Sequence, residues 1–226
     1  MKKLTALLLT LVLLISVAAP ALALRNLENY ASAKFTKNYP VYSGPGEDYY
    51  RANSGKALYG KGGTARIYGV TGNWVMMGYG LSNGDYRIGY ISKDCLNNMT
   101  NLNGNINYNL TFDNQVMYTK SDVPMTDDPI VKCTKLTTVA ANSRVIALGI
   151  IGQWAYVELT NQPQKIRGFI RADHLVDEKG AAPVVPAATP YVHPVVPTAR
   201  PAVTAAPYYP TVTQAPSYTG NAMLSS

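Results

Sequence analysis

The chain has 226 residues, with 20 Lys and Arg against 13 Asp and Glu, and so a formal net charge of +7 at pH 7. A nucleic-acid-binding protein gathers its basic residues on one face or stripe, whereas here they are scattered singly along the sequence. We therefore expect no nucleic-acid partner. The positive charge instead favours a solvated basic surface, or attraction to the anionic polymers of a cell wall.

Residues 1–23 are typical of a secretory signal peptide. Two lysines precede an apolar run over residues 4–19, and Ala21 and Ala23 are the small residues that a signal peptidase accepts. The run is shorter than the roughly 20 residues that usually span a membrane. We expect cleavage after Ala23, no stable membrane anchor afterwards, and a secreted chain with 18 basic and 13 acidic residues, a formal charge of +5.

Two sequence blocks recur in the same order in the middle of the chain. Trp74 and Trp154 lie 80 residues apart, and Gly89 and Gly168 lie 79 apart. A constant offset over two blocks indicates two copies of one domain of about 60 residues. The paired blocks are 65–77 with 144–157, and 87–96 with 167–175.

Each copy alternates apolar and polar residues over short runs separated by Gly, Asn and Asp clusters, a pattern that predicts strands and tight turns. After residue 24 no segment has a convincing helical period, so the predicted fold class is all-β. The predicted organisation is an N-terminal linker (24–37), a first barrel (38–97), a linker (98–112), a second barrel (113–178) and a tail (179–226).

Short motifs in both copies resemble those of the bacterial Src-homology-3 (SH3b) family. Members of this family are small five-stranded barrels found beside cell-wall hydrolases and in secreted surface proteins. In the first copy the resemblance rests on the segments 42–46, 72–74 and 89–91; the second copy keeps its counterparts of the last two, 152–154 and 168–170. Its early segment, 119–124, departs from the family pattern. The resemblance covers roughly residues 38–178 and implies two tandem SH3-like β-barrels.

The resemblance also implies a shallow aromatic groove on each barrel. Tyrosine, with 17 copies against 3 Phe and 2 Trp, suits such a groove and a half-exposed strand equally. Each of these rings could instead cap a barrel core. The candidate ligand-binding residues are Tyr42, Tyr49, Tyr50, Trp74 and Tyr90 in the first copy, and Tyr118, Trp154 and Phe169 in the second.

Cys95 and Cys133 are the only cysteines, and export permits a disulfide between them. The bridge would close a loop of 38 residues and, on the chain-entropy model, stabilise the fold by roughly 4 kcal/mol. It requires the two barrels to dock with these residues close together. Otherwise both thiols stay free.

No catalytic or metal site is expected. A cysteine nucleophile needs a histidine base within hydrogen-bond reach, but Cys95 and His174 occupy equivalent positions of separate copies. The spacing of Cys and His does not fit zinc, and no cofactor is expected. The acidic pairs at 47–48 and 127–128 are interpreted as solvated turn residues rather than as catalytic carboxylates.

The tail changes composition abruptly: nine of the 15 prolines fall between Ala181 and Ser226. Such a proline-rich segment is expected to be extended and disordered. It could thread a thick wall, bind another aromatic-lined domain, or act only as a linker.

Together these features predict a secreted, cell-wall-associated, non-catalytic binding protein. Its barrels would contact peptidoglycan peptide or glycan. The alternative is an extracellular scaffold that recruits another secreted protein.

Overall fold

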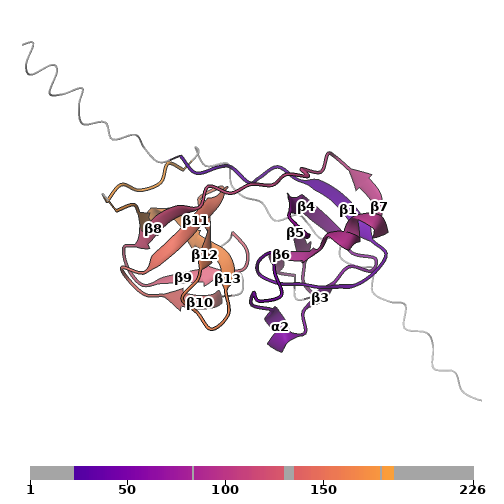
Figure 1. Cartoon of the computed structure of the whole chain (residues 1–226), viewed down its shortest axis with the longest axis horizontal. Coiled ribbons are helices and arrows are strands. Elements are labelled where there is room, and N and C mark those ends of the chain that lie inside the picture. The colour runs from indigo at the N-terminus through magenta and orange to yellow at the C-terminus, as the bar shows by residue number, and fades with distance from the viewer. Residues whose placement is uncertain (1–22, 83, 130–134, 179, 186–226) are drawn as a thin grey trace, which may run out of the picture. The chain divides into compact units, whose positions relative to one another are not determined.

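Among the residues that the structure describes, the short alternating runs of the sequence form two large antiparallel sheets and one two-stranded sheet (Figure 1). The computed structural model describes residues 23–82, 84–129, 135–178 and 180–185, all within one compact unit of the chain. The expected signal peptide up to residue 22 and the tail beyond residue 185 lie outside the described residues. The all-β fold class is confirmed.

The N-terminal sheet has the strand order β6-β5-β4-β1-β7, and every neighbouring pair is antiparallel. A separate pair of short strands, β2 and β3, and a single turn, α2, lie between β1 and β4 in the sequence. The elements are β1 (Ala31–Phe35), β2 (Tyr39–Pro40), α2 (Ala52–Gly55), β3 (Leu58–Tyr59), β4 (Thr64–Thr71), β5 (Trp74–Gly80), β6 (Tyr86–Ser92), a 3₁₀ turn (Lys93–Asn98) and β7 (Met99–Asn103).

The C-terminal sheet has the strand order β10-β9-β13-β12-β11-β8-β14, again antiparallel throughout. Its elements are β8 (Gln115–Thr119), β9 (Val123–Thr126), β10 (Lys135–Val139), β11 (Arg144–Ile151), β12 (Trp154–Leu159), β13 (Ile166–Arg171), a 3₁₀ turn (Ala172–His174) and β14 (Leu175–Val176).

The repeated sequence blocks fold into hairpins with the same register. In the β4–β5 hairpin Thr71 pairs with Trp74, and in the β11–β12 hairpin Ile151 pairs with Trp154. Both connecting turns use a glycine with positive φ, +56° at Gly72 and +54° in its counterpart, which only glycine adopts freely. Both hairpins also carry a register shift three residues before the turn begins, so the repeat extends to local irregularities.

Within the described ranges, three groups of buried side chains form the hydrophobic core. One belongs to the N-terminal sheet, around Phe35, Ile67 and Met77, and one to the C-terminal sheet, around Met117 and Val157. The third draws its members from both sheets, and we call it the interface cluster. It consists of Leu27, Tyr68, Met76, Tyr86, Ile88, Tyr90, Leu110, Leu148, Ile151, Trp154, Tyr156 and Phe169.

Two segments, which we call the first arm (residues 24–30) and the second arm (residues 104–114), cross between the sheets. The first arm precedes β1 but binds the C-terminal sheet: Leu27 N–H donates to the Ile150 carbonyl at 2.9 Å, and Ile150 N–H donates back to the Arg25 carbonyl at 2.7 Å. The segment that leads into the N-terminal sheet is therefore bound to the C-terminal sheet.

The second arm precedes β8 but binds β4 of the N-terminal sheet. Val70 N–H donates to the Asn107 carbonyl and Leu110 N–H donates to the Val70 carbonyl, both at 2.8 Å. Val70 occupies the hairpin position of Ile150 in the other sheet. The two arms are thus exchanged in equivalent ways.

Glycine makes room for both arms at the register shifts. A Cβ at Gly149 would lie 2.7 Å from Leu27 and 2.9 Å from the Arg25 carbonyl oxygen. A Cβ at Gly69, which has a φ of +153°, would lie 2.8 Å from the Asn107 carbonyl oxygen. Any larger residue would push an arm away from its sheet.

The expected domain boundaries need correction because both predicted linkers contain strands. The segment 24–37 holds the first arm and β1, and the segment 98–112 holds β7 and most of the second arm. Both strands are stabilised by pairing with each other rather than by local propensity, since β7 is rich in Asn and poor in β-branched residues. Local sequence patterns therefore missed them.

The beginning of the expected tail is also placed against the fold. Pro183 is buried, Val184 forms a parallel bridge with Ala23, and Val185 packs on the core of the C-terminal sheet beside Leu24. Within the described ranges, no helix is long and apolar enough to cross a membrane.

The arms are predicted to contribute strongly to stability. Leu27 is 4% exposed in the interface cluster, so Leu27→Ala should lower the free energy of unfolding by about 2–5 kcal/mol. Leu58→Ala is the matched control, since Leu58 is 58% exposed and should change stability by no more than about 0.5 kcal/mol. Urea denaturation measures both, and equal effects would contradict the structural role of the first arm.

Candidate functional site

Most of the expected groove aromatics from the later strands are buried where the two sheets meet. Tyr90, Trp154 and Phe169 belong to the interface cluster. Tyr49, also buried, comes from the N-terminal half and donates a hydrogen bond to Glu158 of the C-terminal sheet. Their rings are therefore used in docking one sheet to the other. They do not line an open groove.

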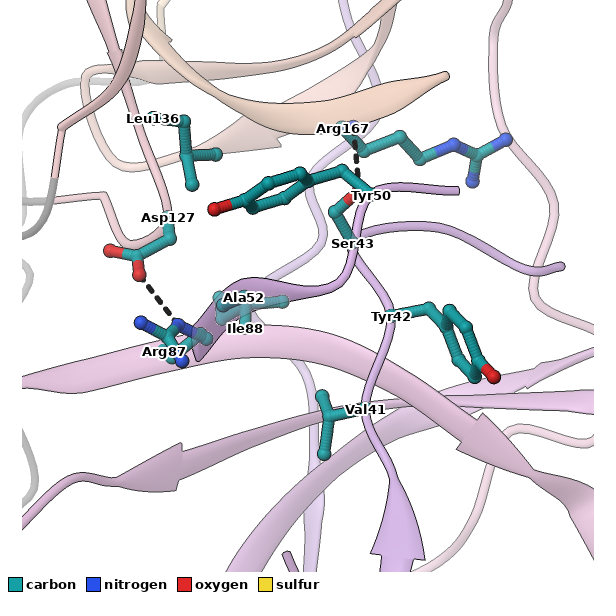
Figure 2. A pocket seen from close by; sticks show the side chains of 10 residues that line it. All are labelled: Val41, Tyr42, Ser43, Tyr50, Ala52, Arg87, Ile88, Asp127, Leu136 and Arg167. Carbon is teal, nitrogen blue, oxygen red and sulfur yellow. Dashed lines mark hydrogen bonds and ion pairs between the residues drawn. The ribbon is translucent and has the colours of Figure 1, made fainter. Parts of the chain in front are cut away.

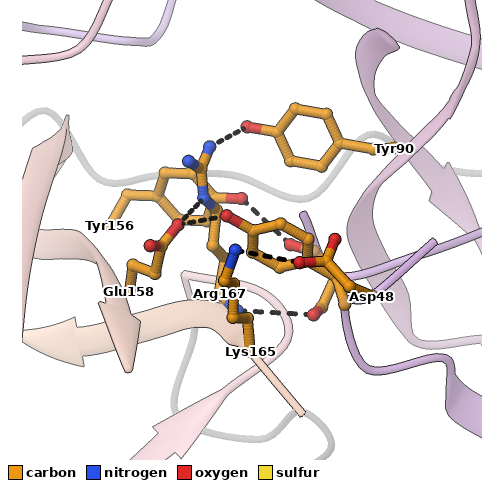
Figure 3. Close-up of polar contacts among 8 residues, drawn as sticks. Asp48, Tyr90, Tyr156, Glu158, Lys165 and Arg167 are labelled. Atoms are coloured by element: carbon orange, nitrogen blue, oxygen red, sulfur yellow. Dashed lines mark hydrogen bonds and ion pairs between the residues drawn. The ribbon is translucent and has the colours of Figure 1, made fainter. Parts of the chain in front are cut away.

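A buried arginine stands at the centre of this interface (Figure 3). Arg167 Nε lies 2.7 Å from Glu158 Oε2, and Arg167 Nη1 donates to the Tyr90 hydroxyl at 3.1 Å. The Tyr49 hydroxyl donates to the same Glu158 oxygen at 2.6 Å. The guanidinium carbon is 5.4, 5.6 and 5.0 Å from the ring centres of Tyr49, Tyr90 and Phe112, within cation–π range.

Arg167 and Tyr49 keep their protonation states near neutral pH. Burial alone disfavours the Arg167 guanidinium, but the surrounding phenols and the Glu158 carboxylate outweigh it, so the pKa of Arg167 is raised. Burial, and then the hydrogen bond to Glu158, raise the pKa of Tyr49. The arginine therefore stays charged and the phenol neutral, and the network acts as a fixed connection between the sheets.

The contacts across the interface are reciprocal. Tyr42 bridges Tyr90 in the N-terminal sheet as Thr126 pairs with Phe169 in the C-terminal sheet. The residues that follow, Ser43 and Asp127, are consequently equivalent. Each of them binds the opposite sheet, as expected for two similar units related by an approximate two-fold axis.

Ser43 and Asp127 bind equivalent backbone amides. Ile88 N–H donates to the Asp127 carbonyl at 2.9 Å, and Arg167 N–H donates to Ser43 Oγ at 3.4 Å. Asp127 makes one further contact, an ion pair of 2.6 Å between its Oδ2 and Arg87 Nε. The two sheets are thus joined by backbone and by charge.

The acidic pair Asp127–Asp128 is not a solvated turn, and that expectation is wrong. Asp127 is 4% exposed and Asp128 is 0% exposed. Burial raises the pKa of Asp127, although Arg87 opposes this shift. The other acidic pair, Glu47–Asp48, is exposed as expected. The difference arises because the loop of Asp127 lies against the other sheet, which no local pattern reveals.

The cavity at the centre of this interface is too small for an organic ligand (Figure 2). Its volume is about 10 Å³, room for about one water molecule. Its lining residues come from both sheets: Val41, Tyr42, Ser43, Tyr50, Ala52, Arg87, Ile88, Asp127, Leu136 and Arg167.

A larger groove opens beside it, and we call it the Tyr50 groove. Its volume is about 350 Å³, within the range of ligand sites. Tyr50 comes from the N-terminal half and the other lining residues from the C-terminal sheet, so the groove exists only when the two halves are docked. The lining residues are Tyr50, Leu136, Thr137, Gln162, Pro163, Gln164 and Ile166.

The loop that forms one wall of the Tyr50 groove is held by the N-terminal half. Tyr50 N–H donates to the Lys165 carbonyl at 2.8 Å, Tyr49 forms a parallel bridge with Lys165, and Lys165 Nζ lies 2.9 Å from Asp48 Oδ2. The ion pair is exposed and is a weak restraint. The backbone contacts fix Lys165, the residue that directly follows Gln162–Gln164.

Of the eight candidate aromatics, Tyr50 alone lines this groove. Tyr42 and Trp74 are half-buried and meet edge to face, with ring centres 5.5 Å apart and Arg51 5.6 Å from the Tyr42 ring. Tyr118 is half-buried on β8, opposite Arg144. The structure therefore brings Tyr42 and Trp74 together but separates them from Tyr118.

Sequence reasoning missed the amide and apolar residues of the groove, Leu136, Thr137 and Gln162–Gln164. The search was for aromatic rings, and these residues have none. One signal was present: the loop between β12 and β13 carries Gln-Pro-Gln flanked by Asn161 and Lys165, an unusual concentration of side-chain amides.

Cys95 is a free, fully buried thiol in the core of the N-terminal sheet. Burial raises its pKa to about 12, which leaves it unreactive as a thiol. Cys133, its expected disulfide partner, lies outside the described residues. Across the described part of the chain, no cluster of three or more His, Cys, Asp or Glu could hold a metal ion.

Comparisons with known proteins add little to this geometry. No protein-family model matches the chain, and no curated protein matches it. Among solved structures it is similar to NlpC2 from Trichomonas vaginalis, with 15% identity, 67% of this chain and 49% of that chain covered, and a TM-score of 0.27. NlpC1 from the same organism gives 14% identity, coverage of 70% and 50%, and the same TM-score. The chain spans about half the length of these structures, and the likeness carries no argument.

The Arg167–Glu158 ion pair gives a prediction for stability. Arg167→Met removes the cation that faces the partly buried Glu158 carboxylate and leaves it only the Tyr49 hydroxyl, so it should lower the free energy of unfolding by about 3 kcal/mol. The double variant Arg167→Met with Glu158→Gln should recover much of this loss, because no unpaired charge remains. Thermal and urea unfolding measure both. Lys165→Met is the control, because its ion pair is exposed and its loss should have little effect; an equal loss there would contradict the prediction.

Asp127 gives a prediction for pH dependence. Because its pKa is raised in the folded protein, the folded state binds more protons than the unfolded state between the two pKa values. Its contribution to stability is therefore fully present below the unfolded pKa and is lost as pH rises through the folded pKa. The free energy of unfolding of the wild type minus that of Asp127→Asn should increase from neutral to acidic pH, as measured by urea titrations at several pH values. A stability difference that decreases toward acidic pH would contradict a raised pKa of Asp127.

Proposed function

We propose that this chain is a secreted, non-catalytic binding protein in which two SH3-like barrels dock to form one shared site for a cell-wall polymer, peptidoglycan peptide or glycan. The observation that carries the proposal is the Tyr50 groove, which is built by both halves of the molecule. The signal-peptide pattern and the net positive charge of the mature chain support a location outside the cell, near anionic wall polymers.

The lining of the groove fits binding better than catalysis. Its side chains offer two amides, a hydroxyl, a proline and a tyrosine, groups that hydrogen-bond and contact the backbone of a peptide or the hydroxyls of a sugar. The lining residues contain no carboxylate, imidazole or thiol. General acid–base or nucleophilic chemistry depends mainly on such groups.

A second candidate function is that of an extracellular scaffold for another secreted protein. It is favoured by the half-exposed cluster of Tyr42, Trp74 and Arg51, because Trp, Tyr and Arg are the residue types enriched at the energetic centres of protein interfaces. Trp74→Ala should abolish capture of a protein partner under this alternative. Binding to the wall through the Tyr50 groove should survive that substitution.

Co-sedimentation with purified sacculi tests the leading proposal. The secreted protein should sediment with the wall at low salt, and a Gln162→Ala and Gln164→Ala double variant should bind about tenfold more weakly, as expected for the loss of one to two net hydrogen bonds. Gln153→Ala is the matched control, since Gln153 is an exposed glutamine in the turn at the other end of β12. Wild-type protein that stays in the supernatant at low salt would refute wall binding.

A further inference from the structure

The Tyr50 groove runs along a strand with an open edge. β10 ends the strand order of the C-terminal sheet, and among the described strands its only neighbour is β9. Leu136 and Thr137 of this strand line the groove. An edge strand presents backbone donors and acceptors that can pair with another extended segment.

A proline in β9 determines which backbone groups of β10 face outward. Thr138 lies opposite Pro124, and proline has no N–H to give to the ladder. This pair is therefore the non-hydrogen-bonded kind, in which the N–H and C=O groups of both residues point away from the partner strand. The Thr138 N–H and C=O consequently face the open edge, while Thr137 and Val139 pair with β9 on either side.

The outward groups of Thr138 are accessible. Thr138 is exposed, and its carbonyl accepts only a long hydrogen bond of 3.4 Å from the Thr137 hydroxyl among the described contacts. A bond of this length is weak, and an incoming donor can replace it.

We propose that the ligand of the Tyr50 groove is an extended peptide that adds as a further strand to β10. It pairs with the Thr138 N–H and C=O and places a side chain between Tyr50 and Pro163. This inference rests on the proposed function and narrows its ligand from peptide or glycan to peptide. Strand addition draws affinity from main-chain hydrogen bonds and specificity from the adjoining pocket.

The charge at this edge favours a peptide that carries carboxylates. Lys135 begins β10, is exposed, and donates from Nζ to Thr138 Oγ1 at 3.3 Å, so its charge lies beside the residue whose backbone the peptide would pair with. The lining of the groove is itself uncharged. Lys135 is the only charged residue of β10.

The position of Tyr50 argues against a sugar in this groove. Sugar recognition commonly uses an open aromatic face, but Tyr50 is half-buried and packs against the cores of both sheets. Its ring therefore packs largely against protein side chains. It can form one wall of the groove, but it offers little open face on which a sugar ring could stack. A glycan would also leave the Thr138 backbone groups without the paired donor and acceptor that a strand supplies.

A substitution at one position tests the proposal. Thr138→Pro removes the outward N–H while leaving the ladder to β9 intact, because proline is tolerated on edge strands where the N–H faces solvent. Thr138→Ala is the matched control: it loses the same hydroxyl and the same contact with Lys135 but keeps the N–H. Peptides released from purified sacculi by an amidase should bind Thr138→Pro about tenfold more weakly than wild type, and Thr138→Ala within about twofold.

A second measurement does not depend on the variant folding. When the released peptides are titrated into the ¹⁵N-labelled wild-type protein, the Thr138 amide signal should shift and its hydrogen exchange should slow. Glycan strands freed of peptide should leave that signal unchanged. Loss of the effect on Thr138, or folded Thr138→Pro that binds peptide as tightly as Thr138→Ala, would overturn strand addition.

The outcomes for the proposed function and for this inference are distinct. If sacculi or glycan strands bind and the released peptides do not, the inference fails and the proposed function stands. If sacculi, glycan strands and peptides all fail to bind, the proposed function itself fails.

Discussion

The exchange of the two arms is the constraint on which the rest of the structure depends. The first arm, which leads into β1, pairs with β11, and the second arm, which leads into β8, pairs with β4, in each case where glycine leaves room for it. Backbone hydrogen bonds of the connecting segments therefore help to hold the two sheets together. The interface cluster, the Arg87–Asp127 ion pair and the Tyr50 groove all require that docking.

The interface combines apolar burial with a small number of charges, and these do different work. Six of the twelve members of the interface cluster are aromatic, and aromatic rings bury large apolar areas. A buried ion pair contributes little net stability after the cost of desolvation, but an unpaired partner is costly. We expect the Arg87–Asp127 ion pair, which joins the two sheets, to fix how they dock, since another alignment would leave the buried Asp127 without its cation. The Arg167–Glu158 pair lies within the C-terminal sheet and contributes to docking through the hydroxyls of Tyr49 and Tyr90.

The parts of the fold that local patterns encode were predictable. The turns at Gly72 and Gly152, the strands on either side of them and the repeat that relates them follow from alternation and glycine placement. β1 and β7 were not predictable, because Asn-rich β7 is extended only through its partner strand. The arms were missed for the same reason: their hydrogen bonds join residues such as Leu27 and Ile150 that are far apart in the sequence.

The candidate site was predictable only in part, for a related reason. Sequence identifies residues that suit a binding surface, but it does not say which surfaces face one another. Tyr90 and Phe169 are residue types that suit a binding groove, but both are buried in the interface cluster. The docking of the two sheets therefore determines their role. Tyr50 alone among the candidate aromatics reached the Tyr50 groove, because its loop rests on the Lys165 backbone at the margin of the interface.

The crossing of the arms also bears on how such a molecule can evolve. Two similar domains joined by a simple linker can be copied, lost or moved to another gene as separate cassettes. Here a cut after the second arm would leave the C-terminal sheet without the first arm, which precedes β1 in the other half, so the C-terminal half is not a self-sufficient genetic module. The two halves must therefore be inherited together if the first arm is to pair with β11.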